Sequence, residues 1–178
     1  HYNTGQTFRS FMEDGFEGVR ANYGDWVDHL STLFPEVRLK STLEYRGADG
    51  QRPELAFALP ALWKGLLYDD DSFSALEGLV DRFSYPEVEA QRHAIARYGV
   101  QTKFMGRDAV DWAGDVLELA EAGLRRIGDY NADGDDESML LAPLRALLER
   151  GRCPADPLLA EVPDEVPSRD AIIAVTAL

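Results

Sequence analysis

The sequence predicts an α+β fold class in which helices dominate and at least one sheet strand lies near residues 37–46. Two observations lead to this prediction. From residue 37 to residue 46 apolar and polar side chains nearly alternate, which is the period of a strand with one buried, apolar face and one open, polar face. Elsewhere apolar residues recur at helical spacing, and residues typical of helix ends stand before and after them.

Two short helices and the strand are expected before residue 50. Apolar side chains at helical spacing predict a first helix over residues 6–13. A second helix is predicted over residues 25–33, with Asp25 as its N-cap and Pro35 ending it. In the strand, the odd positions carry Val37, Leu39, Ser41, Leu43 and Tyr45, and the even positions carry Arg38, Lys40, Thr42, Glu44 and Arg46.

The rest of the chain is expected to be mostly helical, over residues 54–68, 72–83, 86–98, 108–127 and 143–150. Pro60 should kink or split the first of these helices, and Ser72 and Asp108 are the expected N-caps of the second and fourth. The proline-rich tail from Cys153 onward is expected to be irregular. Residues 171–178 fit a strand or a helix.

The composition is that of a folded, strongly acidic protein. Hydrophobic residues make up 45% of the 178 residues, and 32 acidic against 18 basic side chains give a net charge of −14. This charge opposes binding to nucleic acid or anionic membranes, so we expect neither partner. No membrane-spanning apolar run and no signal peptide is recognisable, so we expect a cytoplasmic protein. The single cysteine, Cys153, excludes an intrachain disulfide.

A single strand cannot satisfy its own edges, so further strands are needed. They are expected either within residues 100–105 and at the two ends of the chain, or in sequence outside it. The first residue is His1 rather than Met, which favours the second expectation.

The polar face of the predicted strand is the first candidate site. Arg38, Lys40 and Arg46 concentrate positive charge on an otherwise acidic chain, with Glu44 among them. Arginine binds carboxylate or phosphate groups in bidentate fashion, so this face could hold an anionic substrate. Glu44 could hold a magnesium ion or orient Arg46. An ordinary solvated strand face remains the alternative.

The acidic loop over residues 129–137 is the second candidate. It begins like a calcium-binding EF-hand loop, with oxygen ligands at positions 1, 3 and 5 and glycine at position 6. Position 12, where such a loop needs a bidentate glutamate, is Leu140. We therefore interpret the segment as a solvated loop between helices.

Several stretches of the sequence resemble glutamate–cysteine ligase of the plant and proteobacterial type. They are HLSTLFPEVRLK at 29–40, LEYRGADG at 43–50, ALPALWKGLLYD at 58–69, LAPL at 141–144 and GR at 151–152. The resemblance implies ATP-dependent ligation of the glutamate γ-carboxylate to the cysteine amine through an acyl phosphate, with Mg²⁺ neutralising phosphate charge. It also implies a fold like that of glutamine synthetase, in which a curved antiparallel sheet holds the small-molecule substrates on its open face.

For the site residues, the resemblance implies that Arg46 is a catalytic anion clamp on the glutamate carboxylate or the transferring phosphate. Arg38 and Glu44 become further substrate-binding candidates, and Glu44 also a metal ligand. Tyr45 stands where the family usually has methionine, and Lys64 where an aliphatic residue is usual.

Family members are much longer, and their metal and nucleotide carboxylates lie largely upstream of this strand. We therefore expect residues 1–178 to be a single unit from the C-terminal portion of a larger catalytic domain. Two alternatives remain open at this point. One is a related carboxylate–amine ligase with another amine acceptor. The other is a non-catalytic helical module that binds an anionic metabolite or a protein partner. The sequence leaves the oligomeric state open.

Overall fold

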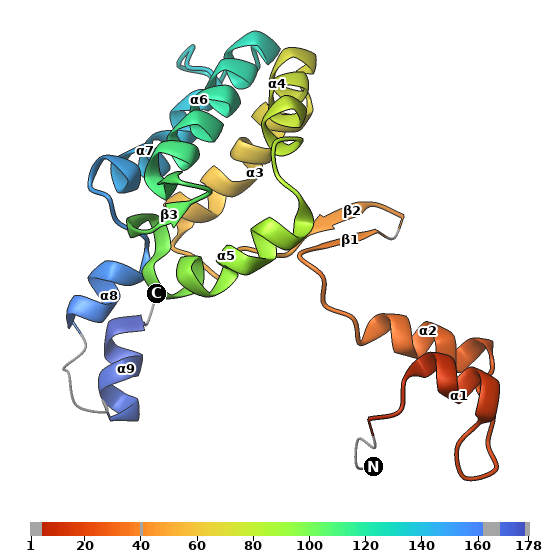
Figure 1. Cartoon of the computed structure of the whole chain (residues 1–178). Coiled ribbons are helices and arrows are strands. Elements are labelled where there is room, and N and C mark those ends of the chain that lie inside the picture. Colours follow the sequence, from red (N-terminus) through yellow and green to blue (C-terminus); the bar gives the residue numbers. More distant parts are fainter. Residues whose placement is uncertain (1–4, 40, 162–167, 177–178) are drawn as a thin grey trace. The chain divides into compact units, whose positions relative to one another are not determined.

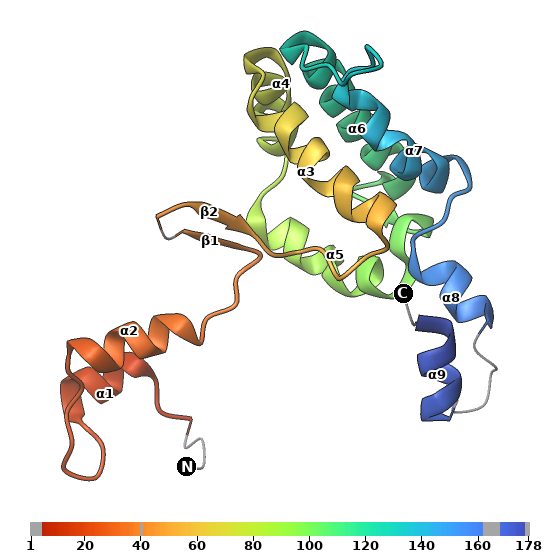
Figure 2. The same cartoon turned by 180° about the vertical axis from the view of Figure 1, so that it is seen from behind.

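The structure is a computed structural model that describes residues 5–39, 41–161 and 168–176. Its fold is α+β, with helices and two small antiparallel sheets (Figures 1 and 2). The chain divides into two compact units, His1–Asp49 and Gly50–Leu178. Within the described ranges, no helix is long and apolar enough to cross a membrane.

The first unit begins with the helices α1 (Phe8–Asp14) and α2 (Tyr23–Ser31). The expected N-cap of α2, Asp25, is wrong. Asn22 caps the helix, and the Asp25 carboxylate accepts a hydrogen bond from the Asn22 N–H at 2.8 Å. This reciprocal arrangement is a capping box, which satisfies two N–H groups at the start of the helix instead of one.

Three aromatic rings hold α1 and α2 together. The Phe8 ring stacks on His29 at a centroid distance of 4.4 Å and lies 5.3 Å from the ring of Trp26. None of the residues described in this unit is buried. The two helices therefore contact each other without enclosing a core.

The segment predicted as one strand forms a β-hairpin of β1 (Val37–Leu39) and β2 (Leu43–Tyr45). Arg38 pairs with Glu44 across the antiparallel ladder. Strands therefore lie near residues 37–46 as predicted, but they are not one continuous strand, because the chain reverses between residues 39 and 43. Three residues separate the strands. Because this number is odd, even-numbered residues of both strands lie on one face of the hairpin and odd-numbered residues on the other. The alternating pattern therefore survives the turn.

The apolar face of this hairpin is exposed, contrary to the expectation that it is the buried one. Val37, Leu39 and Leu43 are 47%, 77% and 57% exposed. Two strands alone cannot bury a face, because each apolar side chain has only one cross-strand neighbour.

The second unit is built on a helical core. Its elements are α3 (Pro53–Leu67), α4 (Asp70–Val80), α6 (Ala109–Ile127), the 3₁₀ turn η2 (Glu137–Leu141) and α7 (Ala142–Glu149). Pro60 lies inside α3 and does not split it. The buried cluster consists of Ala61, Leu66, Leu117, Ala120, Leu124 and Leu141. α3, α4 and α6 lie side by side around it (Figures 1 and 2).

α3 and α6 cross with their backbones in contact. A Cβ atom at Gly65 would lie 2.1 Å from the carbonyl oxygen of Ala120, and one at Gly123 would lie 2.0 Å from the carbonyl oxygen of Gly65. Any side chain at either position would overlap backbone atoms, so the crossing requires glycine on both helices.

A network around Ser72 joins α4 to α6. The expected cap of α4, Ser72, is wrong: Asp69 is the N-cap and accepts a hydrogen bond from the Ser72 N–H at 2.8 Å. The Ser72 hydroxyl is buried and donates to the carbonyl oxygen of Leu119 at 2.8 Å. Hydrogen bonds from Arg126, and then from Ser72, hold the pKa of Asp69 well below its usual range.

A second hairpin lies beside α6. It consists of β3 (Lys103–Phe104) and β4 (Arg107–Asp108), and it follows α5 (Tyr85–Tyr98) and the turn η1 (Gly99–Gln101). β3 pairs with β4 in a two-stranded sheet, so the strand expected within residues 100–105 exists and has its partner in residues 107–108. The Trp112 indole N–H donates to the carbonyl oxygen of Phe104 at 2.9 Å and ties this hairpin to α6.

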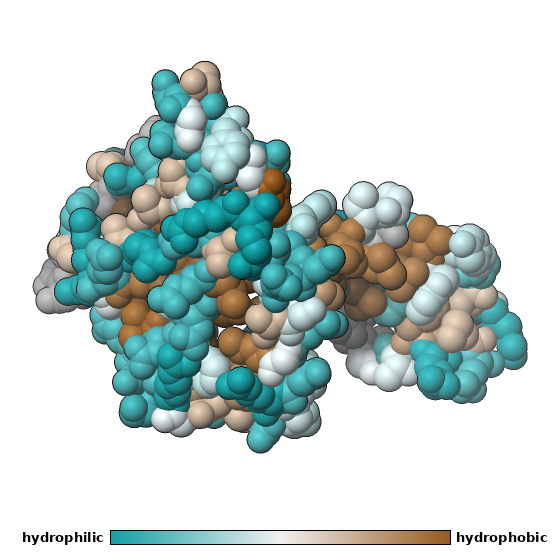
Figure 3. Space-filling model, turned by 90° about the horizontal axis from the view of Figure 1, so that it is seen from above, coloured by the Kyte–Doolittle hydropathy of each residue, from teal (hydrophilic) through white to brown (hydrophobic). Residues whose placement is uncertain are grey.

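The tail contains two helices within its described residues. α8 (Ala155–Glu161) and α9 (Arg169–Thr176) replace the irregular segment expected from residue 153 onward. α9 also resolves the choice between strand and helix for residues 171–176, and residues 177–178 of that prediction lie outside the described residues. Large apolar side chains are exposed in both units, and brown atoms reach the surface between teal ones in Figure 3.

Candidate functional site

The β1–β2 hairpin brings three of the predicted site residues together on one face. Arg38 and Glu44 are cross-strand partners, and Arg46 follows β2 directly. The Arg46 N–H donates to the carbonyl oxygen of Glu36 at 2.8 Å, which continues the ladder by one bond. The third expected cation, Lys40, lies outside the described residues.

Glu44 lies between the two arginines. Its Oε2 atom accepts a hydrogen bond from Arg38 Nε at 2.9 Å and lies 2.7 Å from Arg38 Nη2. Its Oε1 atom lies 4.0 Å from Arg46 Nε. The Glu44 side chain is 45% exposed, so these ion pairs add little stability, but they restrict where the two guanidinium groups point.

Arg46 is held from a second side by an aromatic ring. Its guanidinium carbon lies 4.8 Å from the centroid of the Phe34 ring, within the range of a cation–π contact. Among the described residues, Arg46 Nη1 is the buried side-chain nitrogen that lacks a hydrogen-bond partner. A buried N–H donor without an acceptor is costly, and an anionic oxygen would remove that cost.

The three side chains carry a net charge of +1 in a chain whose net charge is −14. This face therefore differs in sign from the chain as a whole. With Glu44 and Phe34 restraining its guanidinium, Arg46 can offer the Nη1 side to a carboxylate or phosphate oxygen.

A metal site has little support on this face. Glu44 Oε2 is occupied by Arg38, and within the part of the chain that the structure describes no group of three His, Cys, Asp or Glu residues could hold a metal ion. The geometry favours the second role expected for Glu44, which is to orient Arg46.

The acidic loop over residues 129–137 is organised by its own hydrogen bonds and by a lysine. The Asn131 side chain accepts from the N–H groups of Asp133 and Asp135 at 2.9 and 3.0 Å. Lys64 donates from α3 to Asp129 at 2.5 Å and to Glu137 at 2.6 Å. These hydrogen bonds, first the one to Asp129 and then the one to Glu137, raise the pKa of Lys64. The sequence singled out Lys64 only as an unusual residue. In the structure its ion pairs connect α3 to the acidic loop.

Sequence reasoning missed Phe34 as part of the site. Its neighbour Pro35 was used only to end a helix. Nothing in the local pattern predicts that the Phe34 ring, which precedes β1, contacts the guanidinium of Arg46, which follows β2. The available signal was the position of Phe34 within the stretch LFPEVRLK, which carries much of the family resemblance.

The chain is similar to known proteins along nearly its whole length. A family model described as glutamate-cysteine ligase family 2 (GCS2) matches residues 5–177. The chloroplastic glutamate–cysteine ligase of Arabidopsis thaliana is 42% identical over 159 residues, and that of Brassica juncea 39% identical over 159 residues. The chloroplastic ligase A of Oryza sativa subsp. indica is 38% identical over the same length.

These alignments cover 88% of this chain but only 29%, 30% and 31% of the Arabidopsis, Brassica and Oryza proteins. The chain thus spans less than a third of the curated relatives that it matches. Their names also correct one expectation. Each of these relatives is named chloroplastic, so the cytoplasmic location expected from the sequence is contradicted.

Proposed function

This chain belongs to glutamate-cysteine ligase family 2, and from this premise we propose that it is the C-terminal portion of an enzyme that joins glutamate to cysteine. The observation that carries the proposal is the family match over residues 5–177, together with relatives of 38–42% identity that are named for this activity. Glutathione biosynthesis is the pathway to which this activity belongs.

The proposed reaction has two steps. ATP first phosphorylates the γ-carboxylate of glutamate, giving an acyl phosphate and ADP. The amine of cysteine then attacks the acyl carbon, the new C–N bond forms, and phosphate leaves as the amine loses a proton. Both steps develop negative charge on oxygen atoms, so fixed positive groups stabilise their transition states.

Arg46 is the residue of this chain that we assign to that task. Its unpartnered Nη1 atom, its contact with Phe34 and its proximity to Glu44 favour a restrained guanidinium with donors to spare. It would bind a carboxylate oxygen of glutamate or an oxygen of the transferring phosphate. Arg38 and Glu44 are positioning residues, because their 2.7 Å ion pair braces the carboxylate beside Arg46.

The described residues do not fit a magnesium site, so no step of this proposal is routed through a metal here. The carboxylates that bind Mg²⁺ and the groups that bind ATP would belong to the longer part of the enzyme. On this view the β1–β2 hairpin is one portion of a larger antiparallel sheet of the glutamine-synthetase type. The exposed Val37, Leu39 and Leu43 support this assignment, because a larger sheet backed by further structure would cover them.

The test measures phosphate release from ATP by the full-length protein, with glutamate and cysteine added separately and together. We expect release that requires both amino acids. Replacing cysteine with other amines in the same assay distinguishes the alternative ligase, which would prefer another acceptor. A full-length protein that releases no phosphate with any amine would contradict the enzymatic proposal and favour the non-catalytic module.

The role of Arg46 is tested in the same assay with Arg46→Gln and with Arg46→Lys. Loss of a charge-assisted contact made in the transition state should lower kcat/KM by about 100-fold or more. Lysine restores the charge but not the fork of N–H donors, so it should restore only part of the activity. Arg9→Gln, an exposed arginine on α1, is the matched control and should retain the parent rate. Equal rates for Arg46→Gln and the parent would remove Arg46 from the site.

A further inference from the structure

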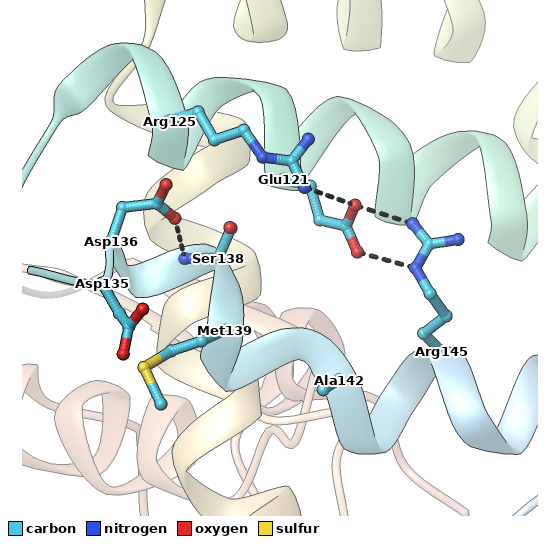
Figure 4. Close-up of a pocket in the computed structure, with 8 residues that line it drawn as sticks. All are labelled: Glu121, Arg125, Asp135, Asp136, Ser138, Met139, Ala142 and Arg145. Carbon is cyan, nitrogen blue, oxygen red and sulfur yellow. Dashed lines mark hydrogen bonds and ion pairs between the residues drawn. The ribbon is translucent and has the colours of Figure 1, made fainter.

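A pocket of about 270 Å³ lies in the second unit, between α6 on one side and η2 and α7 on the other (Figure 4). None of its lining residues belongs to the hairpin site described above. Its lining residues are Glu121, Arg125, Asp135, Asp136, Ser138, Met139, Ala142 and Arg145. A volume of this size is just below that of drug-sized ligand sites, so it suits a small metabolite.

One wall of the pocket is basic and is fixed by a buried carboxylate. Glu121 is only 8% exposed, and it accepts a hydrogen bond from Arg145 Nε at 2.9 Å with a second contact to Arg145 Nη2 at 2.7 Å. Arg125 Nη2 donates to the same carboxylate at 3.3 Å. Each guanidinium has five N–H groups, so both arginines keep donors beyond those that Glu121 uses.

The other wall is acidic. Asp135 and Asp136 come from the loop that precedes η2 and lie across the pocket from Arg145 (Figure 4). Asp136 accepts a hydrogen bond from the Ser138 N–H at 2.8 Å, and the hydrogen bonds of Ser138 lower the pKa of Asp136. This carboxyl group is therefore ionised near neutral pH.

The signs of these charges limit what the pocket can accept. Its three carboxylates and two guanidiniums sum to −1, so a simple anion gains no net attraction. A simple cation would satisfy the acidic wall but would meet the two arginines. A ligand that carries both charges can satisfy both walls, and Met139 and Ala142 add apolar atoms to the lining.

We infer that this pocket binds a small zwitterion, a free α-amino acid, with its carboxylate on Arg125 and Arg145 and its ammonium group on Asp135 and Asp136. The side chain of the amino acid would lie against Met139 and Ala142, so a small apolar side chain fits. This binding site is independent of the ligase chemistry proposed for the hairpin face, and its occupancy can be measured without any turnover.

The test is a ¹H–¹⁵N NMR titration of the 178-residue chain with L-alanine. Propionate and ethylammonium serve as matched probes, since each is alanine without one of its charged groups. We expect saturable shifts confined to residues 121–125 and 135–145. Propionate and ethylammonium should each bind at least about tenfold more weakly than L-alanine, because each lacks one set of charge-assisted hydrogen bonds.

Two variants test the two walls separately. Arg125→Gln removes the arginine with the longer contact to Glu121, so Arg145 still neutralises that buried carboxylate. Asp135→Asn removes an exposed charge from the acidic wall. Each should weaken L-alanine binding about tenfold. Arg150→Gln and Asp133→Asn, which do not line the pocket, should bind like the parent.

Unchanged chemical shifts outside the pocket establish that each variant is folded. Three results would overturn the inference. The first is no saturable shift with L-alanine. The second is propionate binding as tightly as L-alanine, which would indicate an adventitious ion only. The third is equal binding by the wall variants and their controls.

Discussion

The contact between α3 and α6 makes a sharp prediction for Gly123→Ala. The new Cβ would lie 2.0 Å from the carbonyl oxygen of Gly65 and 2.8 Å from the hydroxyl of Ser72. Reaching an ordinary contact distance of 3.4 Å requires the helices to separate by about 1.4 Å. The buried leucines Leu66, Leu117 and Leu124 belong to the core cluster of these two helices, so that separation loosens the core itself.

The magnitude follows from two opposing effects. Overpacking a core costs about 1–3 kcal/mol, and the upper end applies here because the obstacle is backbone and not a flexible side chain. Alanine is a better helix former than glycine by about 1 kcal/mol, which offsets part of that cost. We therefore expect a net loss of about 2 kcal/mol in the free energy of unfolding. For a chain of this size, that loss lowers Tm by about 4–8 °C.

The assay is thermal unfolding of the 178-residue chain, followed by circular dichroism at 222 nm. Gly114→Ala is the matched control, because Gly114 lies in the same helix and a Cβ there meets nothing within 4 Å. It should raise Tm by about 2–4 °C, since only the gain in helix propensity remains. The reasoning is refuted if Gly123→Ala melts at or above the parent temperature. It is also refuted if both variants lose stability equally.

Two other predictions concern the cap of α4 and the two units. The lowered pKa of Asp69 means that folding favours its ionised form. The ionised carboxylate therefore adds to the free energy of unfolding above the unfolded pKa of about 3.9. That contribution is lost as pH falls through the folded pKa. Asp69→Asn should therefore destabilise the chain at pH 7 and flatten the fall in Tm below about pH 4, and an unchanged pH profile would contradict this. Residues 50–178 alone should unfold cooperatively by circular dichroism, because they contain the buried cluster, whereas residues 1–49 alone should not, because none of their described residues is buried. A cooperative transition in the 1–49 fragment would show that its aromatic contacts suffice.

Much of the helical architecture was predictable from local pattern. Asp108 is the N-cap of helix α6, as the sequence predicted, and Gly128 follows the helix in the left-handed conformation with φ 71°. The caps of α2 and α4 were misassigned by three residues. In both helices the true cap, Asn22 or Asp69, stands one turn before the residue chosen, and its side chain binds the N–H of that residue.

The tail shows the limit of composition as a guide. Its prolines predicted irregular structure, but Pro157 lies within the first turn of α8, where the missing N–H costs nothing. Proline breaks a helix only in its interior, so the count of prolines was less informative than their positions.

The candidate site was partly predictable, because the alternation of apolar and polar residues is a local pattern. Alternation placed Arg38 and Glu44 on one face, and that conclusion holds because the turn between the strands has an odd number of residues. The hairpin itself was missed, because Ser41 and Thr42 carry none of the glycine or asparagine signals of a tight turn.

By itself, the sequence determined the local features of this protein: the α+β class, most of its helices, the parity of the charged face and the family to which the chain belongs. These depend on residues within a few positions of one another. The tertiary structure alone decided the Gly65–Gly123 crossing, the cation–π contact of Phe34 with Arg46, and the pocket between α6 and α7. Each of these features joins residues that come into contact only when the chain folds back on itself. Neither the spacing of apolar residues nor the capping residues of the helices predict such contacts.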